Sequence, residues 1–314
     1  MIITVTLNAA LDLTYRVAAL RPHTTHRVLD TVERPGGKGL NVARVLAALG
    51  HPCTVTGFAG GAPGAELRQR LAATPEAAGG LLTDALRPVG GATRRTVGVV
   101  DVSTGDTTMF NEPGPTVTAA EWADFLDTYR GLLEAGDVTA VALCGSLPPG
   151  VPVGAYADLV REARATGVFV LLDTHGEPLR RGVAARPDLI KPNAEELAGL
   201  TGYSEPGRAA RDARRRGARA VAASLGAEGM LLISEEGGWR AVAPERLAGN
   251  PTGAGDSAVA GLLSGVAEKL SWPERLARAV ALSAATVAAP AAGEFAPATY
   301  TSTLPRVTVT PAPA

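Results

Sequence analysis

An α/β fold with a mostly parallel central sheet is expected for this chain. Short runs rich in β-branched residues, typical of buried strands, alternate with longer amphipathic runs, typical of helices. Such alternation builds βαβ units, whose crossover helices cover a parallel sheet on both faces. The 314 residues, of which 46% are hydrophobic and 19% charged, suffice to bury a large core.

The expected elements follow from these runs. Strands are expected at residues 2–7, 54–58, 139–143, 168–172, 189–190, 220–224 and 230–233. Helices are expected at residues 39–49, 65–73, 119–133, 154–166, 195–201, 208–216, 255–269 and 273–288. The arginines of the run at residues 208–219 would mostly face solvent on a helix, so we interpret them as a solvated face.

Two stretches, at about residues 12–33 and 93–112, break this alternation. They are rich in Thr, Val and Arg at period two, and residues 102–106 resemble a hairpin turn. We expect a small separate β-layer that forms a lid over one edge of the main sheet; an extra antiparallel edge on that sheet is the alternative. Exposed strands of such a lid could also pair with a second subunit, giving a homodimer.

Charge, hydropathy and cysteine content argue against a nucleic-acid-binding, membrane-spanning or secreted protein. A net charge of -1 provides no general attraction to nucleic acid or to an anionic membrane. No apolar run reaches the ~18 residues that cross a bilayer, and the chain opens in a strand-like run without a signal-peptide core. Cys53 and Cys144 lie in apolar segments, as small buried hydrophobes do in a reducing compartment. We expect a cytoplasmic protein with one domain over residues 1–300 and a loosely ordered tail over residues 301–314.

The strongest chemical signal is the run NPTGAGDS at residues 250–257, which opens a helix of small residues. Gly253 and Gly255 permit a tight turn that approaches a ligand closely, and the first amides of the helix favour an anion. Asp256 would repel an anion but suits a general base beside one. Alternatively, Asp256 only caps the helix. The run matches neither a Walker A loop nor a dinucleotide-binding fingerprint.

A second glycine-rich turn, GGKGLN at residues 36–41, also opens a helix. Lys38 offers a positive charge, and Asn41 offers both a donor and an acceptor. Both suit a polyhydroxylated or phosphorylated ligand. The alternative is an ordinary turn with a surface lysine.

Two segments between these turns could contact a nucleotide or a metal. Asn193 and Glu196 are three residues apart, hence on one helix face, and offer oxygen ligands that suit Mg²⁺ through water. A helix N-cap with a capping box fits the same spacing. The run SLGAEG at residues 224–229 could contact a nucleotide through its backbone, or be a turn alone.

Taken in chain order, GGKGLNVA, KPNAEEL, SLGAEG and NPTGAGDSAVAGLL resemble the PfkB (ribokinase-like) family of carbohydrate kinases, over residues 1 to about 292. TLNAALDLTYRV, TRRTVGVV and CGSLPPGVP look most like the branch of 1-phosphofructokinase and tagatose-6-phosphate kinase. The resemblance implies a ribokinase-like three-layer α/β/α sandwich with a β-sheet lid. It also implies that ATP, with Mg²⁺, phosphorylates a hydroxyl of a sugar that already carries a phosphate.

The resemblance further implies roles for matching residues. Asp256 would be the catalytic base, with the amides of Gly253, Ala254 and Gly255 as an anion hole. The sugar would be held by Asp12, Gly37, Lys38, Asn41, Arg94, Glu112 and Ser146, with Arg94 facing its phosphate and Arg27 and Arg95 as weaker candidates. ATP would contact Lys191, Asn193, Ser224, Gly226, Gly229 and Thr252, and Mg²⁺ would lie near Asn193 and Glu196.

Other functions stay open at this point. A kinase for an unphosphorylated sugar or nucleoside would keep the same base, but would not need Arg94. A non-catalytic sugar or nucleotide sensor on the same scaffold would not need Asp256. A dinucleotide-dependent oxidoreductase would need a glycine fingerprint after the first strand, which the sequence lacks. The sequence leaves open whether the sugar is fructose 1-phosphate, tagatose 6-phosphate or fructose 6-phosphate.

Overall fold

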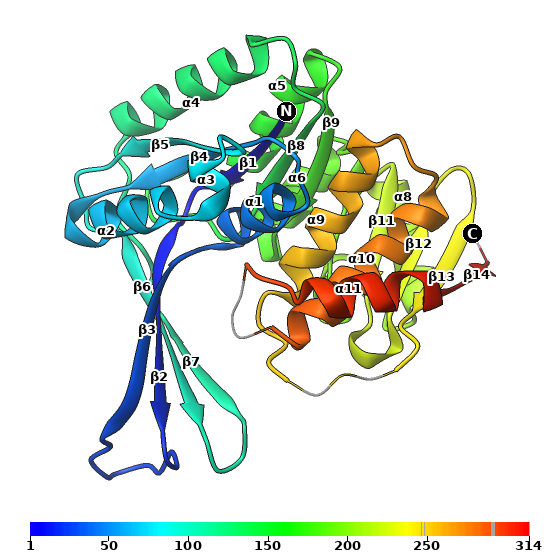
Figure 1. The fold of residues 1–314 in the computed structure, drawn as a ribbon. Coiled ribbons are helices and arrows are strands. Elements are labelled where there is room, and N and C mark those ends of the chain that lie inside the picture. Colours follow the sequence, from blue (N-terminus) through cyan, green and yellow to red (C-terminus); the bar gives the residue numbers. More distant parts are fainter. Residues whose placement is uncertain (246, 248, 290–292, 314) are drawn as a thin grey trace.

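The computed structural model describes residues 1–245, 247, 249–289 and 293–313, which form a body and a smaller sheet that projects from it (Figure 1). The body contains a 10-stranded sheet in the order β14-β13-β12-β11-β10-β9-β8-β1-β4-β5. Its strands are β1 (Ile2–Thr6), β4 (Cys53–Ala59), β5 (Leu82–Pro88), β8 (Ala140–Cys144), β9 (Phe169–Asp173), β10 (Leu189–Ile190), β11 (Ala220–Ser224), β12 (Met230–Ile233), β13 (Gly238–Val242) and β14 (Thr308–Ala312). From β5 to β11 neighbouring strands are parallel, and β12, β13 and β14 extend the sheet antiparallel at one edge. The expected α/β fold is confirmed.

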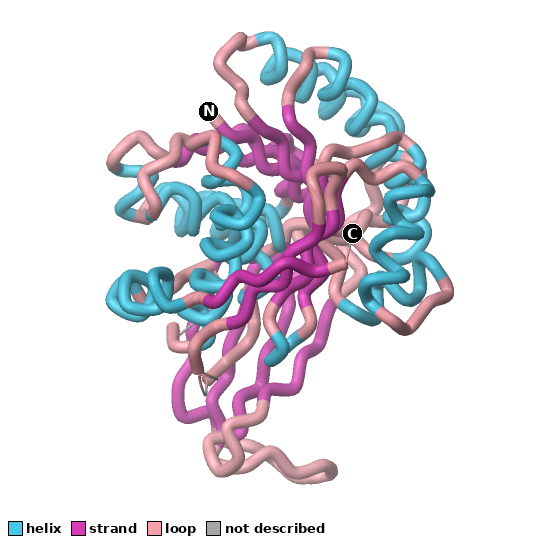
Figure 2. Tube along the Cα trace, turned by 90° about the vertical axis from the view of Figure 1, so that its right-hand side faces the viewer, coloured by secondary structure: helices cyan, strands magenta, loops and turns pink. Residues whose placement is uncertain are grey.

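Helices cover both faces of this sheet (Figure 2). They are α1 (Lys38–Ala48), α2 (Gly61–Ala72), α3 (Pro75–Ala78), α4 (Ala119–Glu134), α5 (Ala155–Ala165), α6 (Gly176–Ala184), α7 (Ala194–Thr201), α8 (Pro206–Arg216), α9 (Ala254–Ala267), α10 (Trp272–Val287) and α11 (Pro297–Thr303). Side chains of α4 to α8 pack on one face in one buried cluster, and those of α1, α2, α9 and α10 pack on the other. The arrangement is the three-layer sandwich that the resemblance implied.

The second sheet is the expected lid. It is 4-stranded, in the order β3-β2-β6-β7, and comprises β2 (Ala10–Val17), β3 (Val28–Gly36), β6 (Arg94–Asp101) and β7 (Thr107–Asn111). Figure 1 shows it projecting from the body as a twisted ribbon. The stretches that broke the helix–strand alternation therefore form a separate layer, because their period-two pattern suits a sheet with two exposed or partly exposed faces.

The C-terminal tail corrects one expectation. Residues 301–314 were expected to be loosely ordered, but β14 pairs antiparallel with β13 over five positions, from Gly238↔Ala312 to Val242↔Thr308. Alternating Thr and Val favour an edge strand, where the one proline of β14, Pro311, is tolerated. The tail thus completes the antiparallel edge of the sheet.

Other expectations concerned single residues. Cys53 and Cys144 are buried free thiols, as expected. In α8, Arg215 and Arg216 pair with Asp212 and stay largely exposed, which confirms the solvated face. Within the described part of the chain, no helix is long and apolar enough to cross a membrane.

Close packing between α9 and α10 gives a test of the fold. A Cβ at Gly261 would lie 2.7 Å from the Cα and 2.8 Å from the backbone nitrogen of Ala279. Gly261→Ala should therefore lower the free energy of unfolding by ~1–3 kcal/mol, measured by urea denaturation.

Gly199→Ala is the matched control, because Gly199 is exposed in α7 and an added Cβ would meet no atom within 4 Å. It should raise the free energy of unfolding by ~0.5–1 kcal/mol, since alanine costs less backbone entropy in a helix. Equal effects of the two substitutions would contradict the packing described.

Candidate active site

Two glycine turns bring the first turns of α1 and α9 together on one face of the sheet. Gly37 caps α1 with φ 110°, and Gly253 caps α9 with φ 83°, values that favour glycine. A Cβ at Gly39 would lie 2.3 Å from Thr6 Oγ1, so α1 starts directly on β1. The close approach is possible only because these positions carry no side chain.

Asp256 lies where the two helices meet. Its side chain is buried, with 7% of the residue exposed. Asn41 Nδ2, from the first turn of α1, donates to Asp256 Oδ2 at 2.8 Å. Burial, reinforced by the negative charge of Asp173, raises the pKa of Asp256 to about 6, against the opposing effects of Lys38, Asn41 and Lys191. The carboxylate is therefore an unusually strong base for an aspartate, although it still ionises at neutral pH.

Asp173, at the carboxyl end of β9, organises the charges around Asp256. It is 1% exposed, accepts from Lys38 Nζ at 3.1 Å and lies 3.7 Å from Lys191 Nζ. Within the described residues its Oδ2 has no hydrogen-bond partner. Burial would lower the pKa of Lys38, but Asp173, Asp256 and Glu196 outweigh it and raise that pKa. Lys38 thus acts as a fixed cation and not as a base.

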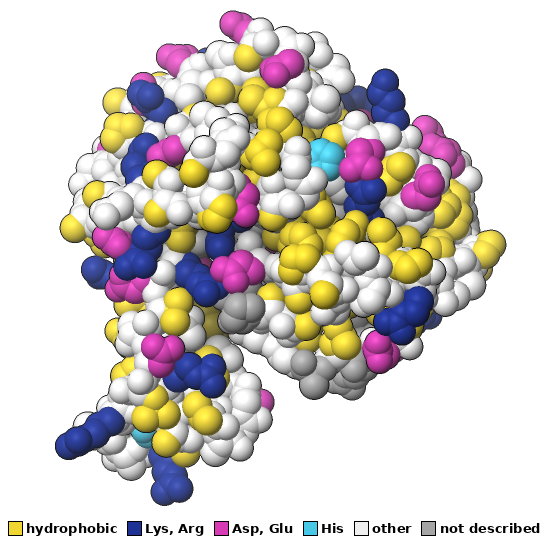
Figure 3. Space-filling model, viewed as in Figure 1, with side chains coloured by type: hydrophobic (Ala, Val, Ile, Leu, Met, Phe, Trp, Pro, Cys, Tyr) yellow, Lys and Arg dark blue, Asp and Glu magenta, His cyan; other side chains and the backbone are white. Residues whose placement is uncertain are grey.

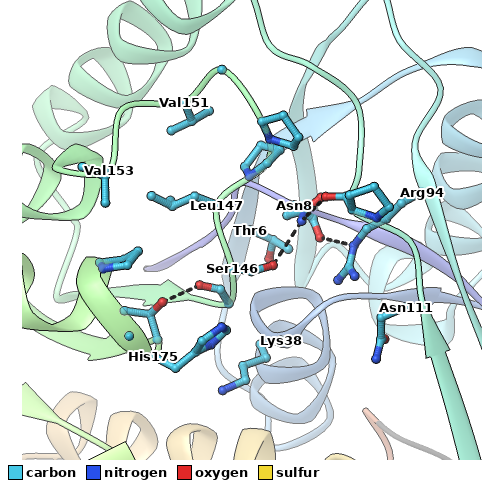
Figure 4. Close-up of a pocket in the computed structure, with 18 of the residues that line it drawn as sticks. Thr6, Asn8, Lys38, Arg94, Asn111, Ser146, Leu147, Val151, Val153 and His175 are labelled. Carbon is cyan, nitrogen blue, oxygen red and sulfur yellow. Dashed lines mark hydrogen bonds between the residues drawn. The ribbon is translucent and has the colours of Figure 1, made fainter. Parts of the chain in front are cut away.

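A cavity of about 990 Å³ opens beside Lys38, between the body and the lid (Figure 4). It is lined by Thr6, Asn8, Lys38, Arg94, residues 111–113 and 145–151, Val153 and residues 174–178. Asn8 Nδ2 donates to Ser146 Oγ and to the Pro113 carbonyl, both at 3.1 Å, which fixes the wall on this side. Four expected sugar contacts therefore share one cavity: Lys38, Arg94, Glu112 and Ser146.

Arg94 is held in that cavity by two backbone carbonyls. Its Nε donates to the oxygen of Asn8 at 3.1 Å and its Nη1 to the oxygen of Glu112 at 3.2 Å. The remaining guanidinium donors are left for a ligand. Arg95 projects from the opposite face of β6 and Arg27 lies exposed in the β2–β3 connection, and neither lines the cavity.

Asp12 lies on the inner face of the lid, opposite Arg34 and Thr96 in the ladder. Thr96 Oγ1 donates to Asp12 Oδ1. Burial raises the pKa of Asp12, while Thr96 and Arg94 oppose that rise. A Cβ at Gly36 would overlap the Asp12 carboxyl, so glycine at residue 36 makes room for this side chain. Asp12 and Gly37 do not line the described cavity wall, although both adjoin it through β2 and α1.

A second cavity, of about 580 Å³, lies on the other side of the α9 turn. Its walls come from residues 193–195, 224, 226, 227, 229, 230, 243, 245, 247, 249, 251, 254, 255, 258, 280, 283, 284 and 287. Six expected ATP or anion contacts lie here: Asn193, Ser224, Gly226, Gly229, Ala254 and Gly255. Ala258, Val280, Ala284 and Val287, from α9 and α10, form an apolar part of the wall, which suits a flat apolar group. The two cavities flank the buried Asp256.

Some expected contacts have other partners in this structure. The Ala254 amide donates to the Pro251 carbonyl at 3.1 Å, and the Thr252 amide donates to Asn250 Oδ1 at 3.0 Å. Asn193 and Glu196 form the capping box of α7, each side chain accepting from the other's amide at 2.8 Å. The capping alternative is therefore present, and Glu196 keeps only Oε1 for another partner.

Sequence reasoning missed Asp173 and Asn8. A signal for Asp173 existed, because Asp directly follows a buried run of β9 and ligands of open α/β sheets gather at the carboxyl ends of strands. Asn8 gives no local signal, since its partners Pro113 and Ser146 lie 105 and 138 residues away in the chain.

Comparison with known proteins agrees with this geometry. A curated 1-phosphofructokinase from Rhodobacter capsulatus is 39% identical over 290 residues, covering 90% of both chains. Phosphofructokinase-2 from Escherichia coli, solved in complex with fructose-6-phosphate, is 28% identical with a TM-score of 0.87, covering 97% of this chain and 98% of that one. Arabidopsis thaliana ribokinase, at 22% identity and a TM-score of 0.75, covers 96% of this chain and 98% of its own and shares the fold.

Residues 5–299 match the pfkB family carbohydrate kinase. This range holds both glycine turns, both cavities and Asp256, and kinases of this family use ATP as the phosphoryl donor. The chain belongs to the pfkB family of carbohydrate kinases.

Proposed function

We propose that this kinase transfers the γ-phosphoryl group of ATP to a free hydroxyl of a phosphosugar, with fructose 1-phosphate as its preferred acceptor. The observation that carries the proposal is Asp256, buried between a cavity with Arg94 and Lys38 and a cavity with apolar walls. The cationic cavity suits a phosphosugar and the apolar one a nucleotide base. The relative named 1-phosphofructokinase favours fructose 1-phosphate.

In the proposed reaction the acceptor hydroxyl lies beside Asp256, with its oxygen in line with the γ-phosphorus. Asp256 accepts the hydroxyl proton as the new O–P bond forms, and the bond from the γ-phosphorus to the bridging oxygen breaks, releasing ADP. Lys38 stays protonated and neutralises charge on the transferred group, while the α9 N-terminus offers amides such as that of Gly255. Asn41 orients the carboxylate.

The donor set also fits a hydrated Mg²⁺. Glu196 Oε1 makes no hydrogen bond among the described residues, and the carboxylate lies near enough to Lys38 to raise the pKa of that amine. Mg²⁺ usually keeps several of its water ligands, so a carboxylate oxygen that contacts the ion through water suits it. When bound, it would neutralise charge on the phosphates of ATP; Glu196, with Asn193 placing it, would hold it there.

A homodimer through the lid is part of the same proposal. Leu29 and Phe110 are 63% and 58% exposed on the lid, and in the described part of the chain the edge strands β3 and β7 each have a free outer side. Figure 3 shows hydrophobic side chains on the projecting lid. Sedimentation velocity tests this proposal: the protein should sediment as a dimer at micromolar concentration. A monomer under these conditions would contradict it.

The test of the acceptor is an ADP-release assay with MgATP. Fructose 1-phosphate should exceed fructose 6-phosphate, tagatose 6-phosphate, fructose and ribose in kcat/KM by about a hundredfold, or ~2.7 kcal/mol of transition-state discrimination. A higher kcat/KM for another phosphosugar would make that sugar the preferred acceptor. Turnover of unphosphorylated sugars alone would refute the phosphosugar proposal.

Asp256→Asn should lower kcat by ~10²–10⁴ because the amide cannot accept the proton. Binding of ATP and sugar, measured by calorimetry, should stay near wild type. Asp158→Asn, on the exposed face of α5, controls for loss of a charge. Retention of most of kcat by the Asp256 variant would remove Asp256 from the role of base.

The pH profile tests how Asp256 is tuned. Because the pKa of Asp256 is raised to about 6, its carboxylate is lost as pH falls through that value, and kcat should fall with it. Asp173→Asn removes a neighbouring negative charge, so the acid limb should move to lower pH. The substrate phosphate, which titrates near pH ~6 as well, contributes equally to both enzymes. An acid limb at the same pH in both would show that Asp173 does not tune the base.

Arg94→Ala should raise KM for the phosphosugar by about 10- to 150-fold, through loss of a charge-assisted contact of ~1.5–3 kcal/mol. KM for ATP should not change. Arg95→Ala is the matched control, since Arg95 is the neighbouring cation on the other face of β6. If both substitutions leave the phosphosugar KM unchanged, the phosphate binds elsewhere.

A further inference from the structure

One carboxylate joins three separate parts of the molecule where the lid meets the body. Glu294 Oε1 accepts from Arg34 Nη1 at 2.7 Å and from Arg44 Nη2 at 3.1 Å. Arg34 belongs to the lid strand β3, Arg44 to helix α1, and Glu294 to the segment that follows α10. Figure 3 shows basic and acidic side chains gathered at the base of the lid. The mechanism proposed above uses none of these three residues.

On one side, the two arginines lie beside groups of the sugar site. Arg34 stands opposite Asp12 in the β2–β3 ladder, and the charge of Arg44 also acts on Asp12. Arg44 follows Asn41 by one turn of α1, and Asn41 donates to Asp256. A shift of Arg34 or Arg44 would therefore change the surroundings of Asp12, the expected sugar contact, and of Asp256, the proposed base.

On the other side, Glu294 belongs to a segment fixed to the nucleotide cavity. The Ala296 amide donates to the Ala285 carbonyl of α10 at 3.1 Å, and the neighbours Ala284 and Val287 line that cavity. A Cβ at Gly293 would lie 2.7 Å from Arg44 Nη1 and 2.8 Å from Asn41 Oδ1. The segment thus touches the first turns of α1 directly while it is anchored to α10.

The contact of Glu294 with Arg44 differs from a surface ion pair because Arg44 is largely buried. Arg44 is 10% exposed at its side chain, and burial together with the nearby Arg34 lowers the pKa of Arg44, against the effect of Glu294. If the negative charge were lost, Arg34 and Arg44 would face each other as like charges and repel. The Glu294 carboxylate thus offsets the repulsion between Arg34 of β3 and Arg44 of α1.

The opposite face of β3 provides a comparison. Glu33 and Arg34 are neighbours in a strand and so point to opposite faces. Glu33 Oε2 accepts from Arg70 of α2 at 2.8 Å, at a distance from both cavities. Among the described residues, the lid base thus forms an ion pair with α2 through Glu33 and another, between Arg34 and Glu294, with the segment that follows α10.

We infer that Glu294 is a positioning residue that couples the nucleotide cavity to the lid and the sugar site. Movement of α10 on nucleotide binding reaches Glu294 through residues 293–296, and Glu294 transmits it to β3 and α1. Occupation of one cavity then favours the arrangement that closes the other. The inference rests on the proposed function only for the identity of the sugar ligand.

The test compares Glu294→Gln, which keeps the side-chain size but removes its charge, with the wild type and with Glu33→Gln. For whichever phosphosugar the wild type turns over, Glu294→Gln should raise KM about tenfold, in the usual range of coupling between sites. The Kd for ATP without sugar should change less than about twofold and kcat less than about threefold, because neither cavity loses a ligand contact. KM for ATP at saturating phosphosugar should rise by a factor similar to that for the sugar, because coupling between two sites is reciprocal. Glu33→Gln, which removes the negative charge from the ion pair with Arg70, should leave the phosphosugar KM unchanged.

Hydrogen–deuterium exchange gives a readout that needs no sugar. Addition of Mg²⁺ and adenylyl-imidodiphosphate should protect peptides of α10 and of the lid base, residues 28–36, in the wild type and in Glu33→Gln. In Glu294→Gln the α10 peptides should still be protected and the lid base should not. Combining Arg34→Gln with Glu294→Gln should add little to the effect of Glu294→Gln alone, since that substitution already removes the charge that pairs with Arg34.

Two results would overturn the coupling: nucleotide protection of the lid base that persists in Glu294→Gln, or an equal rise of KM in Glu294→Gln and Glu33→Gln. These outcomes leave the proposed function intact. Conversely, a wild type that turns over no phosphosugar would refute the proposed function, while the exchange experiment would still decide whether Glu294 couples the nucleotide cavity to the lid.

Discussion

Burial of the Asp256 carboxylate at the meeting point of α1 and α9 is the constraint on which this site depends. An aspartate taken out of water is costly unless donors and cations surround it. Asn41 supplies the donor, and Lys38 and Lys191 supply charge. These groups can approach only because glycines at residues 37, 39 and 253 let both helices begin close to β1 and to each other.

The same constraint explains the role of Asp173. Two lysines alone would depress the pKa of Asp256 and weaken it as a base. Asp173 accepts from Lys38, lies close to Lys191, and adds its own negative field, so the balance leaves the pKa of Asp256 at about 6. In the proposed mechanism the site therefore keeps cations for the phosphoryl group without losing the base that would activate the hydroxyl.

The sequence predicted the fold and the central chemistry because both have local signals. Alternating runs gave the parallel sheet, and glycines beside Asp256, Lys38 and Asn41 marked the two turns. Contacts that depend on distant chain segments gave none: Asp173 meets Lys38 across 135 residues, and Glu294 meets Arg34 across 260. β13 and β14 were missed because β13 is a short run that begins with a glycine and β14 contains a proline, so both become strands by pairing at the edge of the sheet. Asn193 and Glu196 show a further limit, because one spacing serves both a helix cap and a metal site.

A sugar kinase must prevent water from accepting the phosphoryl group in place of the sugar hydroxyl, and a lid that covers the sugar cavity can exclude that water. Asp256 would activate a water molecule as readily as a sugar hydroxyl, so the chemistry must wait until the sugar cavity is filled and covered. The wall of that cavity is shared: Arg94 comes from the lid and Lys38 from the body. The arrangement of the lid base against α1 therefore decides whether both cations can face one ligand. A lid tied to α2 alone would respond to the sugar only. Under the coupling inferred above, a lid tied also through Glu294 would respond to the nucleotide as well, so that bound ATP favours the arrangement of the lid base that receives the sugar.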